Sequence, residues 1–176
     1  MILGLDISTS ITGVTVLNSE GEVIFCDVCD LRKDKGFFQK VEKAKIFLET
    51  LASNREVKKI FVEQSLQSFR TGFSSAQTLS TLARFNGTLS WLCYELFNIE
   101  PEFIGASTAR RLCGIKVPRG RKAKEVVLEK ILDIDSDFVI EYTKHGNPKP
   151  GTYDRADSLV IAKAGYEICK ERSLSS

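Results

Sequence analysis

Long hydrophobic runs are missing from this sequence. No apolar stretch reaches the roughly 18 residues that a membrane-spanning helix needs, so we expect no membrane span. A secretory leader is not expected either, because the chain opens directly on an apolar, strand-like run instead of a basic segment followed by an apolar one. These two absences predict a cytoplasmic protein.

Paired cysteines and a strong net charge are also lacking. The five cysteines are odd in number and irregularly spaced, which favours free thiols in a reducing compartment over a disulfide framework. Cys26 and Cys29 form a CxxC pattern, but they fall in a predicted strand, where side chains three apart point to opposite faces. We therefore expect no metal or redox site there. The net charge of +2 argues neither for nor against nucleic acid until the charges are placed along the chain.

The size of the chain limits its organisation. With 176 residues, 43% of them hydrophobic, it suits one compact domain and leaves little room for a second. We expect residues 1–176 to form a single domain.

The stretch from Met1 to Leu17 carries the first functional signal. Ile2 to Ile7 is almost continuously apolar, as in a strand buried on both faces, yet it contains Asp6. Burying an unpaired carboxylate costs several kcal/mol, so Asp6 must be paired, hydrogen-bonded or bound to a cation. A polar turn follows, and Val14 to Leu17 forms a second strand. Asp6 either caps this turn or serves a function.

Strands and helices alternate beyond this hairpin, which indicates an α/β fold. Strands are predicted at Glu22 to Cys29, Lys59 to Val62 and Glu102 to Gly105, and an amphipathic helix at Phe37 to Ala52. Glu63 directly follows the fourth strand. Like Asp6, it is a carboxylate at the carboxyl end of a buried strand, where open α/β sheets place their ligand sites.

A loop and a long helix occupy the middle of the chain. Phe69 and Phe73 flank Arg70 in the predicted loop Ser65 to Phe73. The helix Ser74 to Phe97 has a broad apolar face and many small residues, which allow another backbone to approach closely. It is either the central helix of the core or a contact between two copies of the chain.

Basic residues gather after the fifth strand. Ser107 is predicted to cap a short helix ending at Leu112. The segment from Arg110 to Lys124 contains no acidic residue, and Pro118 and Gly120 within it predict a loop. This segment is either a solvated loop or a contact for a phosphate backbone. Its basic residues are Arg110, Arg111, Lys116, Arg119, Arg121, Lys122 and Lys124.

The last predicted helix, from about Asp154 to Glu171, brings two more carboxylates. Asp154 and Asp157 lie one turn apart on one helix face, at a helix N-terminus that favours negative charge. An N-cap with a solvated aspartate would explain this pair alone. If the pair converges with Asp6 and Glu63, however, repulsion would prevent all four from ionising without divalent cations between them. Oxygen ligands select Mg²⁺ or Mn²⁺, and two such ions about 3.5–4 Å apart cleave phosphodiesters.

Four stretches of the sequence resemble the RuvC-type Holliday junction resolvases, within the ribonuclease H-like superfamily. They follow one another in the family's order over nearly the whole chain. They are ILGLDISTSITGVTVL, IFVEQSLQSF, GASTARRLCGIKVPRGRKAKEVV and YDRADSLVIAKAG. The resemblance implies a ribonuclease H-like fold, with a five-stranded mixed sheet whose first three strands form an antiparallel meander, flanked by helices.

The resemblance also implies an activity: a crossover junction endonuclease that resolves four-way DNA junctions by paired, symmetric nicks in recombination and repair. The catalytic and metal-binding residues would be Asp6, Glu63, Asp154 and Asp157, holding two Mg²⁺ ions, with Mn²⁺ able to substitute. These ions would generate a hydroxide and stabilise the leaving 3′ oxygen, giving 5′-phosphate and 3′-hydroxyl ends. Lys124 would neutralise charge at the scissile phosphate.

Further DNA contacts and a dimer follow from the same resemblance. Arg110 and Arg111 correspond to a basic pair of the family, and Phe69 or Phe73 to a loop aromatic that stacks on bases, unless these phenylalanines only anchor their loop. Arg70 and the basic residues 116, 119, 121 and 122 are the other expected DNA contacts. Two symmetric cuts require a homodimer, for which helix 74–97 is the expected interface.

Departures from the family pattern leave other functions open. The first loop, ISTSITG, has fewer glycines than in cellular members, and the loop 114–122 is longer and more charged. A phage or viral member, active in the host cytoplasm and cutting flaps, three-way junctions or replication forks, is therefore an alternative. More distant alternatives are an ATPase of the actin and sugar kinase type, whose phosphate-binding hairpin the opening also resembles, and a non-catalytic junction-binding protein.

Overall fold

The computed structural model describes residues 1–64 and 76–175, which form five strands and five helices. The strands are β1 (Ile2–Asp6), β2 (Ile11–Leu17), β3 (Val23–Asp30), β4 (Lys59–Glu63) and β5 (Glu102–Ile104). The helices are α1 (Phe37–Asn54), α2 (Ala76–Phe97), α3 (Ala106–Leu112), α4 (Ala123–Ile134) and α5 (Thr152–Leu174). None of the helices described is long and apolar enough to cross a membrane.

All five strands belong to one mixed sheet in the order β3-β2-β1-β4-β5. The first three form an antiparallel meander, whereas β4 pairs in parallel with both β1 and β5. This topology confirms the predicted α/β fold. The second strand starts three residues earlier than predicted, at Ile11, because the Ser8 hydroxyl closes a tight turn. The hydroxyl oxygen of Ser8 accepts a hydrogen bond from the backbone N–H of Ile11 (N to Oγ, 3.1 Å). The same hydroxyl donates a hydrogen bond to the carbonyl oxygen of Ile11 (Oγ to O, 2.8 Å).

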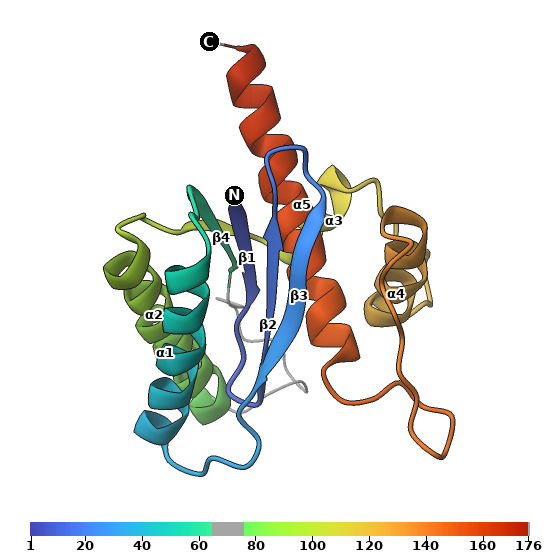
Figure 1. The fold of residues 1–176 in the computed structure, drawn as a ribbon. Helices are drawn as coiled ribbons and strands as arrows, with labels where there is room; N and C mark the ends of the chain where they lie inside the picture. Colours follow the sequence, from blue (N-terminus) through green and yellow to red (C-terminus); the bar gives the residue numbers. More distant parts are fainter. Residues whose placement is uncertain (65–75, 176) are drawn as a thin grey trace.

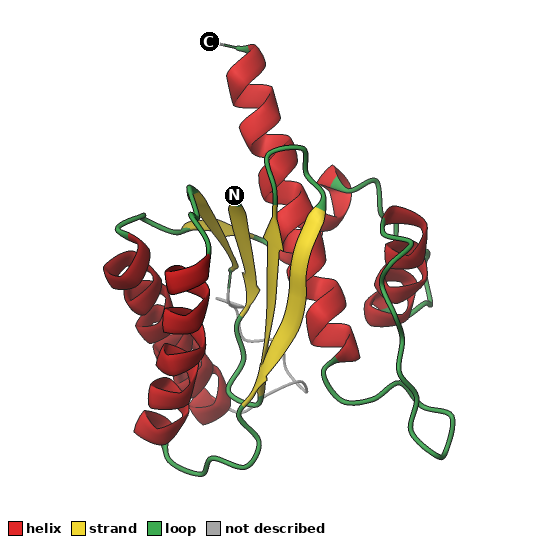
Figure 2. Cartoon of the chain, viewed as in Figure 1, coloured by secondary structure: helices red, strands yellow, loops and turns green. Residues whose placement is uncertain are grey.

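Helices cover both faces of the sheet and give three layers (Figures 1 and 2). Helices α1 and α2 lie on one face, and α5 crosses the other face with α3 and α4 packed against it. Each face has its own hydrophobic cluster. Along β1, Leu3 and Leu5 enter the cluster with α1 and α2, whereas Ile2 enters the cluster with α5. Because side chains alternate along a strand, Asp6 points to the α5 side.

The central helix of the core is α5, not the helix 74–97 for which that role was one prediction. Buried residues such as Leu159, Ile161 and Ala162 leave α5 almost no free surface along its first half. Helix α2 buries only one face, and Trp91 and Tyr94 on its other face are 58% and 50% exposed. Residues 74 and 75 of the predicted helix lie outside the described part.

Two local predictions have different outcomes. Cys29 is buried in the cluster with α1 and α2, whereas Cys26 packs on the α5 side. The two thiols therefore face opposite sides of the sheet, as predicted. The predicted cap at Ser107 is wrong: Gly105 is the N-cap of α3, and Ser107 lies within the first turn of the helix. The tendency of serine to cap a helix is local, whereas α3 begins where β5 ends.

Candidate active site

Two of the four predicted carboxylates extend from neighbouring parallel strands. The register pairs Leu5 of β1 with Val62 of β4, and Asp6 and Glu63 are the next residues on their strands. On β4, Phe61 belongs to the cluster with α5 and Val62 to the other cluster, so alternation directs Glu63 to the α5 side as well. Asp6 and Glu63 therefore share one edge and one face of the sheet.

Helix α5 brings the other two carboxylates to this edge. Gly13 pairs with Asp6 across β1 and β2, and a Cβ atom at position 13 would overlap the carbonyl oxygen of Asp154. The absence of a side chain at Gly13 thus lets the first turn of α5 lie directly on the sheet beside Asp6. Asp157 follows one turn further along the helix. Gly4 allows a second close approach, because its Cβ would lie 2.6 Å from Ala162.

A buried polar pair fixes α5 in this position. The hydroxyls of Thr15 on β2 and Ser158 on α5 lie 2.8 Å apart, and both residues are buried. Ser158 also donates to the carbonyl of Arg155 at 2.9 Å. Ser158 is the residue directly after Asp157. The hydrogen bond between Thr15 and Ser158 therefore holds the helix turn that carries Asp154 and Asp157 against the sheet.

The four carboxyl groups share one electrostatic environment. Burial raises the pKa of Asp6 well above its usual value, and each of the other three carboxylates raises it further. Burial is also the main cause that raises the pKa of Glu63 to about 7 and that of Asp157 to about 6. The pKa of Asp154 is raised in the same way. Such raised values mean that the folded chain resists carrying four negative charges at this edge.

The four carboxylates lie near one another but are not arranged as a metal-coordinating group. Among residues 1–64 and 76–175, no group of three or more histidine, cysteine, aspartate or glutamate side chains is arranged to hold a metal ion. The donor chemistry nevertheless fits a hard cation, because the four groups offer only oxygen atoms and carry excess negative charge. A divalent ion would offset the burial and the mutual repulsion that raise the pKa values of these groups.

Two predicted basic residues lie close to the carboxylates. Lys124, in the first turn of α4, lowers the pKa of each of the four groups. Arg110, at the end of α3, lowers the pKa of Glu63 and Asp157. Lys124 is exposed and Arg110 is half-buried, so both charges stand at the solvent side of the cluster.

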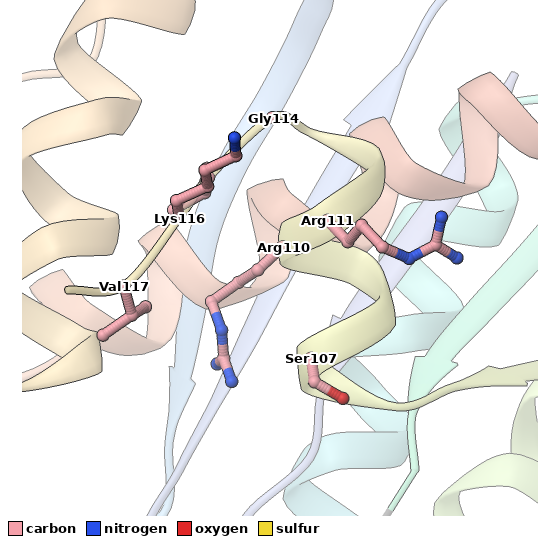
Figure 3. Close-up of a pocket in the computed structure, with 7 residues that line it drawn as sticks. Ser107, Arg110, Arg111, Gly114, Lys116 and Val117 are labelled. Atoms are coloured by element: carbon pink, nitrogen blue, oxygen red, sulfur yellow. The ribbon is translucent and has the colours of Figure 1, made fainter. Parts of the chain in front are cut away.

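A pocket of about 300 Å³ lies between α3 and the segment that follows it, and Arg110 belongs to its lining. Arg110, Arg111 and Lys116 line it together with Ser107 and Val117. In Figure 3, the Arg110 side chain extends toward the same end of α3 as Ser107, whereas Arg111 extends away from it. The predicted basic pair therefore presents its two charges in different directions.

The remaining predicted DNA contacts differ in their surroundings. Arg121 forms a two-pronged ion pair with Glu129, at 2.9 and 2.6 Å, and Lys122 lies 3.3 Å from Glu125. Arg119 is exposed. Part of the basic charge read from the sequence is thus balanced by α4. Phe69, Arg70 and Phe73 lie outside the described residues.

Sequence reasoning missed a third basic neighbour, Arg32, which follows β3. Its guanidinium donates two hydrogen bonds to the carboxylate of Asp30, from Nε at 2.9 Å and from Nη2 at 2.6 Å. The positive charge of Arg32 also lowers the pKa of Asp154. Nearby, the Lys40 ammonium on α1 donates to the carbonyl of Thr9, in the turn after Asp6. The position of Arg32 could have been predicted from the meander, because its third strand ends on the same side of the sheet as its first strand, which carries Asp6.

Three solved structures that this chain resembles are Holliday junction resolvases. Thermus thermophilus RuvC in complex with a Holliday junction substrate superimposes with a TM-score of 0.70 at 13% identity, over 97% of this chain and 94% of that chain. Another Thermus thermophilus RuvC structure gives 0.65 at 15% identity, over 97% and 96%. The yeast mitochondrial Holliday junction resolvase gives 0.63 at 16% identity, over 98% and 80%.

These similarities define the fold. No protein-family model and no curated protein sequence matches the chain. At such low identity the likeness is one of architecture, and it extends over nearly the full length of the chains compared. The chain therefore has the ribonuclease H-like fold of the RuvC-type resolvases.

Proposed function

We propose that this protein is a magnesium-dependent endonuclease that resolves four-way DNA junctions by paired, symmetric nicks. The observation that supports the proposal most is the meeting of four carboxylates from three separate chain segments at one sheet edge, with raised pKa values and basic residues beside them. A purely structural cluster of this kind would only reduce stability. The resolvase fold adds the class of substrate.

Asp6, Glu63, Asp154 and Asp157 would hold two Mg²⁺ ions. When bound, the ions supply an activated water and stabilise charge on the leaving 3′ oxygen. Lys124 offsets negative charge that builds on the phosphate, and Arg110, whose charge acts on Glu63 and Asp157, orients a neighbouring phosphate oxygen. The sheet and α5 contribute rigid positions, because both strand ends and the first turn of the helix are packed.

The test of the proposed activity compares wild type with Asp6→Asn on labelled four-way, three-way, flap, linear duplex and single-stranded DNA. We expect paired Mg²⁺-dependent nicks in the four-way junction, lost with EDTA and reduced at least about a thousandfold in Asp6→Asn, while junction binding stays within about twofold. The matched control is Asp27→Asn, which removes an exposed carboxylate from β3.

Each other result would change the assignment. Cutting of every branched substrate would make the protein a general debranching nuclease. Tight junction binding with no metal-dependent cutting would favour the non-catalytic binder, and ATP hydrolysis would favour the kinase relative. Full activity of Asp6→Asn would contradict the proposed role of the carboxylates.

We also propose that two copies associate through the exposed face of α2. This face combines the small residues Ala83 and Gly87 with Trp91 and Tyr94, which are half or more exposed. Small residues let two helices approach closely, and the aromatic rings supply apolar contact area. Trp91→Glu is expected to shift the molar mass from dimer to monomer in light scattering. Ile46→Glu, which changes another exposed apolar residue on α1, should leave the mass unchanged.

Residues 1–176 are further proposed to act as one nuclease domain. The C-terminal helix packs on the first strands, so removing either segment would expose the core of the other. One cooperative unfolding transition, with the same midpoint by circular dichroism and by calorimetry, is the expected result.

A further inference from the structure

An aromatic side chain stands in solvent at the start of α1, at the end of the molecule where β1 and α5 place the carboxylates. Phe38 is 79% exposed, which leaves more of its ring in water than that of any other phenylalanine among the exposed large hydrophobic residues described. It lies in the first turn of α1. Figure 1 shows α1 starting at the end of the molecule at which α5 also starts, the end that carries the carboxylates.

The ring of Phe38 rests on an anchored neighbour. Phe37 packs against the buried ring of Phe85, with centroids 5.8 Å apart, and the guanidinium of Arg84 lies 5.1 Å from the Phe37 centroid. Phe38 contacts Phe37 edge to face at 5.4 Å. The exposed ring of Phe38 therefore packs against an anchored ring on one side. Little side-chain freedom would be lost when another planar ring stacks on its free side.

Two contacts link this turn of α1 to the carboxylates. Lys40, two residues after Phe38, donates to the carbonyl of Thr9 in the turn that follows Asp6. Arg32, six residues before Phe38, acts electrostatically on Asp154. Phe38 thus lies between Arg32, whose charge acts on Asp154, and Lys40, which is hydrogen-bonded to the turn after Asp6.

The surroundings of Phe38 are basic and not apolar. Residues 32–43 include five basic side chains and two acidic ones. Asp34 is paired with Lys43 at 3.2 Å, whereas Lys33 and Lys35 are exposed. Lysine is depleted in protein interfaces, but an exposed aromatic ring flanked by basic residues is the arrangement that binds unpaired nucleotides.

We infer that Phe38 is a stacking platform for a base that is unpaired near the cleaved strand, with Lys33 and Lys35 holding the adjoining phosphates. The inference rests on the proposed nuclease function and adds a nucleic-acid contact on α1, which lies on the other face of the sheet from α4 and Lys124. It also explains why a large apolar ring stays in water: the surface is completed only by the substrate.

The experiment measures binding of a four-way junction with 2-aminopurine near its centre, by anisotropy and by fluorescence quenching, in the Asp6→Asn protein without cleavage. Adding Phe38→Ala should weaken binding roughly fivefold to a hundredfold and remove the quenching, as expected when one base loses its stacking partner. Phe38→Trp should bind within about twofold of the parent and keep the quenching.

Two matched variants separate stacking from other effects. Ile46→Ala truncates an exposed apolar residue further along α1, 56% exposed, and should change neither signal. The pair Lys33→Ala and Lys35→Ala should lower the slope of log affinity against log salt by about 1.4, because two phosphate contacts to a single strand are lost. Phe38→Ala should leave this slope unchanged.

The outcomes distinguish this inference from the proposed function. If the parent protein does not bind junctions and wild type does not cut them, the nuclease proposal fails first. If binding and cutting occur but Phe38→Ala retains both affinity and quenching, the stacking role alone is overturned. If Phe38→Ala alters only self-association, the ring is a protein contact and the inference is equally wrong.

Discussion

The two faces of the sheet differ in what they present to their helices. Toward α1 and α2, β1 and β4 offer large apolar side chains such as Leu3, Ile60 and Val62, all nearly or fully buried. Toward α5, the positions nearest the candidate site are small or polar, as at Gly13 and Thr15. The first face contributes burial alone, whereas the second combines an apolar cluster of its own with the close approach that places the charged groups. Stability thus depends on both sides of the strands, and the proposed activity on the α5 side.

The largest loss of stability and activity is expected from adding a side chain at Gly13, where α5 lies directly on the sheet. Gly13→Ala would drive a methyl group into the Asp154 carbonyl, so α5 must shift away from the sheet. We expect a loss of about 4 kcal/mol or more in the free energy of unfolding, together with most of the cleavage activity. Urea unfolding of both forms measures this. In the monomeric Trp91→Glu background, Gly87→Ala, with open space around position 87, should be neutral or slightly stabilising. Equal behaviour of the two variants would contradict the role of Gly13.

The opposite face should respond in stability alone. Leu3→Ala removes a fully buried side chain from the cluster with α1 and α2, which costs about 3 kcal/mol through lost burial and the cavity left behind. Cleavage per folded molecule should stay near wild type at a temperature where both proteins are folded. A specific loss of activity in Leu3→Ala, measured with the folded fraction known from circular dichroism, would show that the faces are not separable.

Charge on the α5 side should make stability depend on pH. The pKa of Glu63 is about 7 in the fold, against 4.5 ordinarily, so the folded state holds a proton that the unfolded state releases. Without metal, the contribution of Glu63 to stability should therefore be greatest below about pH 4.5 and be lost as the pH rises through about 7, by roughly 1–3 kcal/mol.

Glu63→Gln tests the source of this dependence. The variant cannot ionise at position 63, so in EDTA it should be more stable than wild type at pH 8 and nearly equal at pH 4.5. Thermal melts across this range measure the difference. Added Mg²⁺ should raise the melting temperature of wild type and have a smaller effect on Glu63→Gln. Parallel curves for the two proteins at all pH values would contradict the account.

The smallest effect concerns the polar pair between β2 and α5. Thr15→Val removes one partner of the 2.8 Å contact with Ser158, while Ser158 keeps its bond to the Arg155 carbonyl. A loss of about 1 kcal/mol is expected. A double-mutant cycle with Ser158→Ala, by denaturant unfolding, isolates the pair, and a coupling energy near zero would mean that it does not hold α5.

Patterns along the chain predicted the four carboxylates because each interrupts or follows an apolar element that can be recognised locally. Asp6 and Glu63 stand out within buried strands, and Asp154 and Asp157 share the spacing of one helix turn. The contact of Gly13 with α5 could not be predicted, because it joins residues that are far apart in sequence and depends on the register of β1 and β2. The same holds for Arg32, whose proximity to Asp154 results from the sheet order.

The packing of α5 on β1 and β2 also determines when the site exists during synthesis. The hairpin with Asp6 emerges from the ribosome well before α5, its neighbour in the fold, which lies more than 130 residues later in the chain. Such non-local pairing is slow to form and completes the core late. A nascent chain carries Asp6 and Glu63 without the aspartates of α5. The proposed cleavage activity therefore begins only once the helix from Thr152 onward has docked, so an unfinished chain leaves DNA uncut.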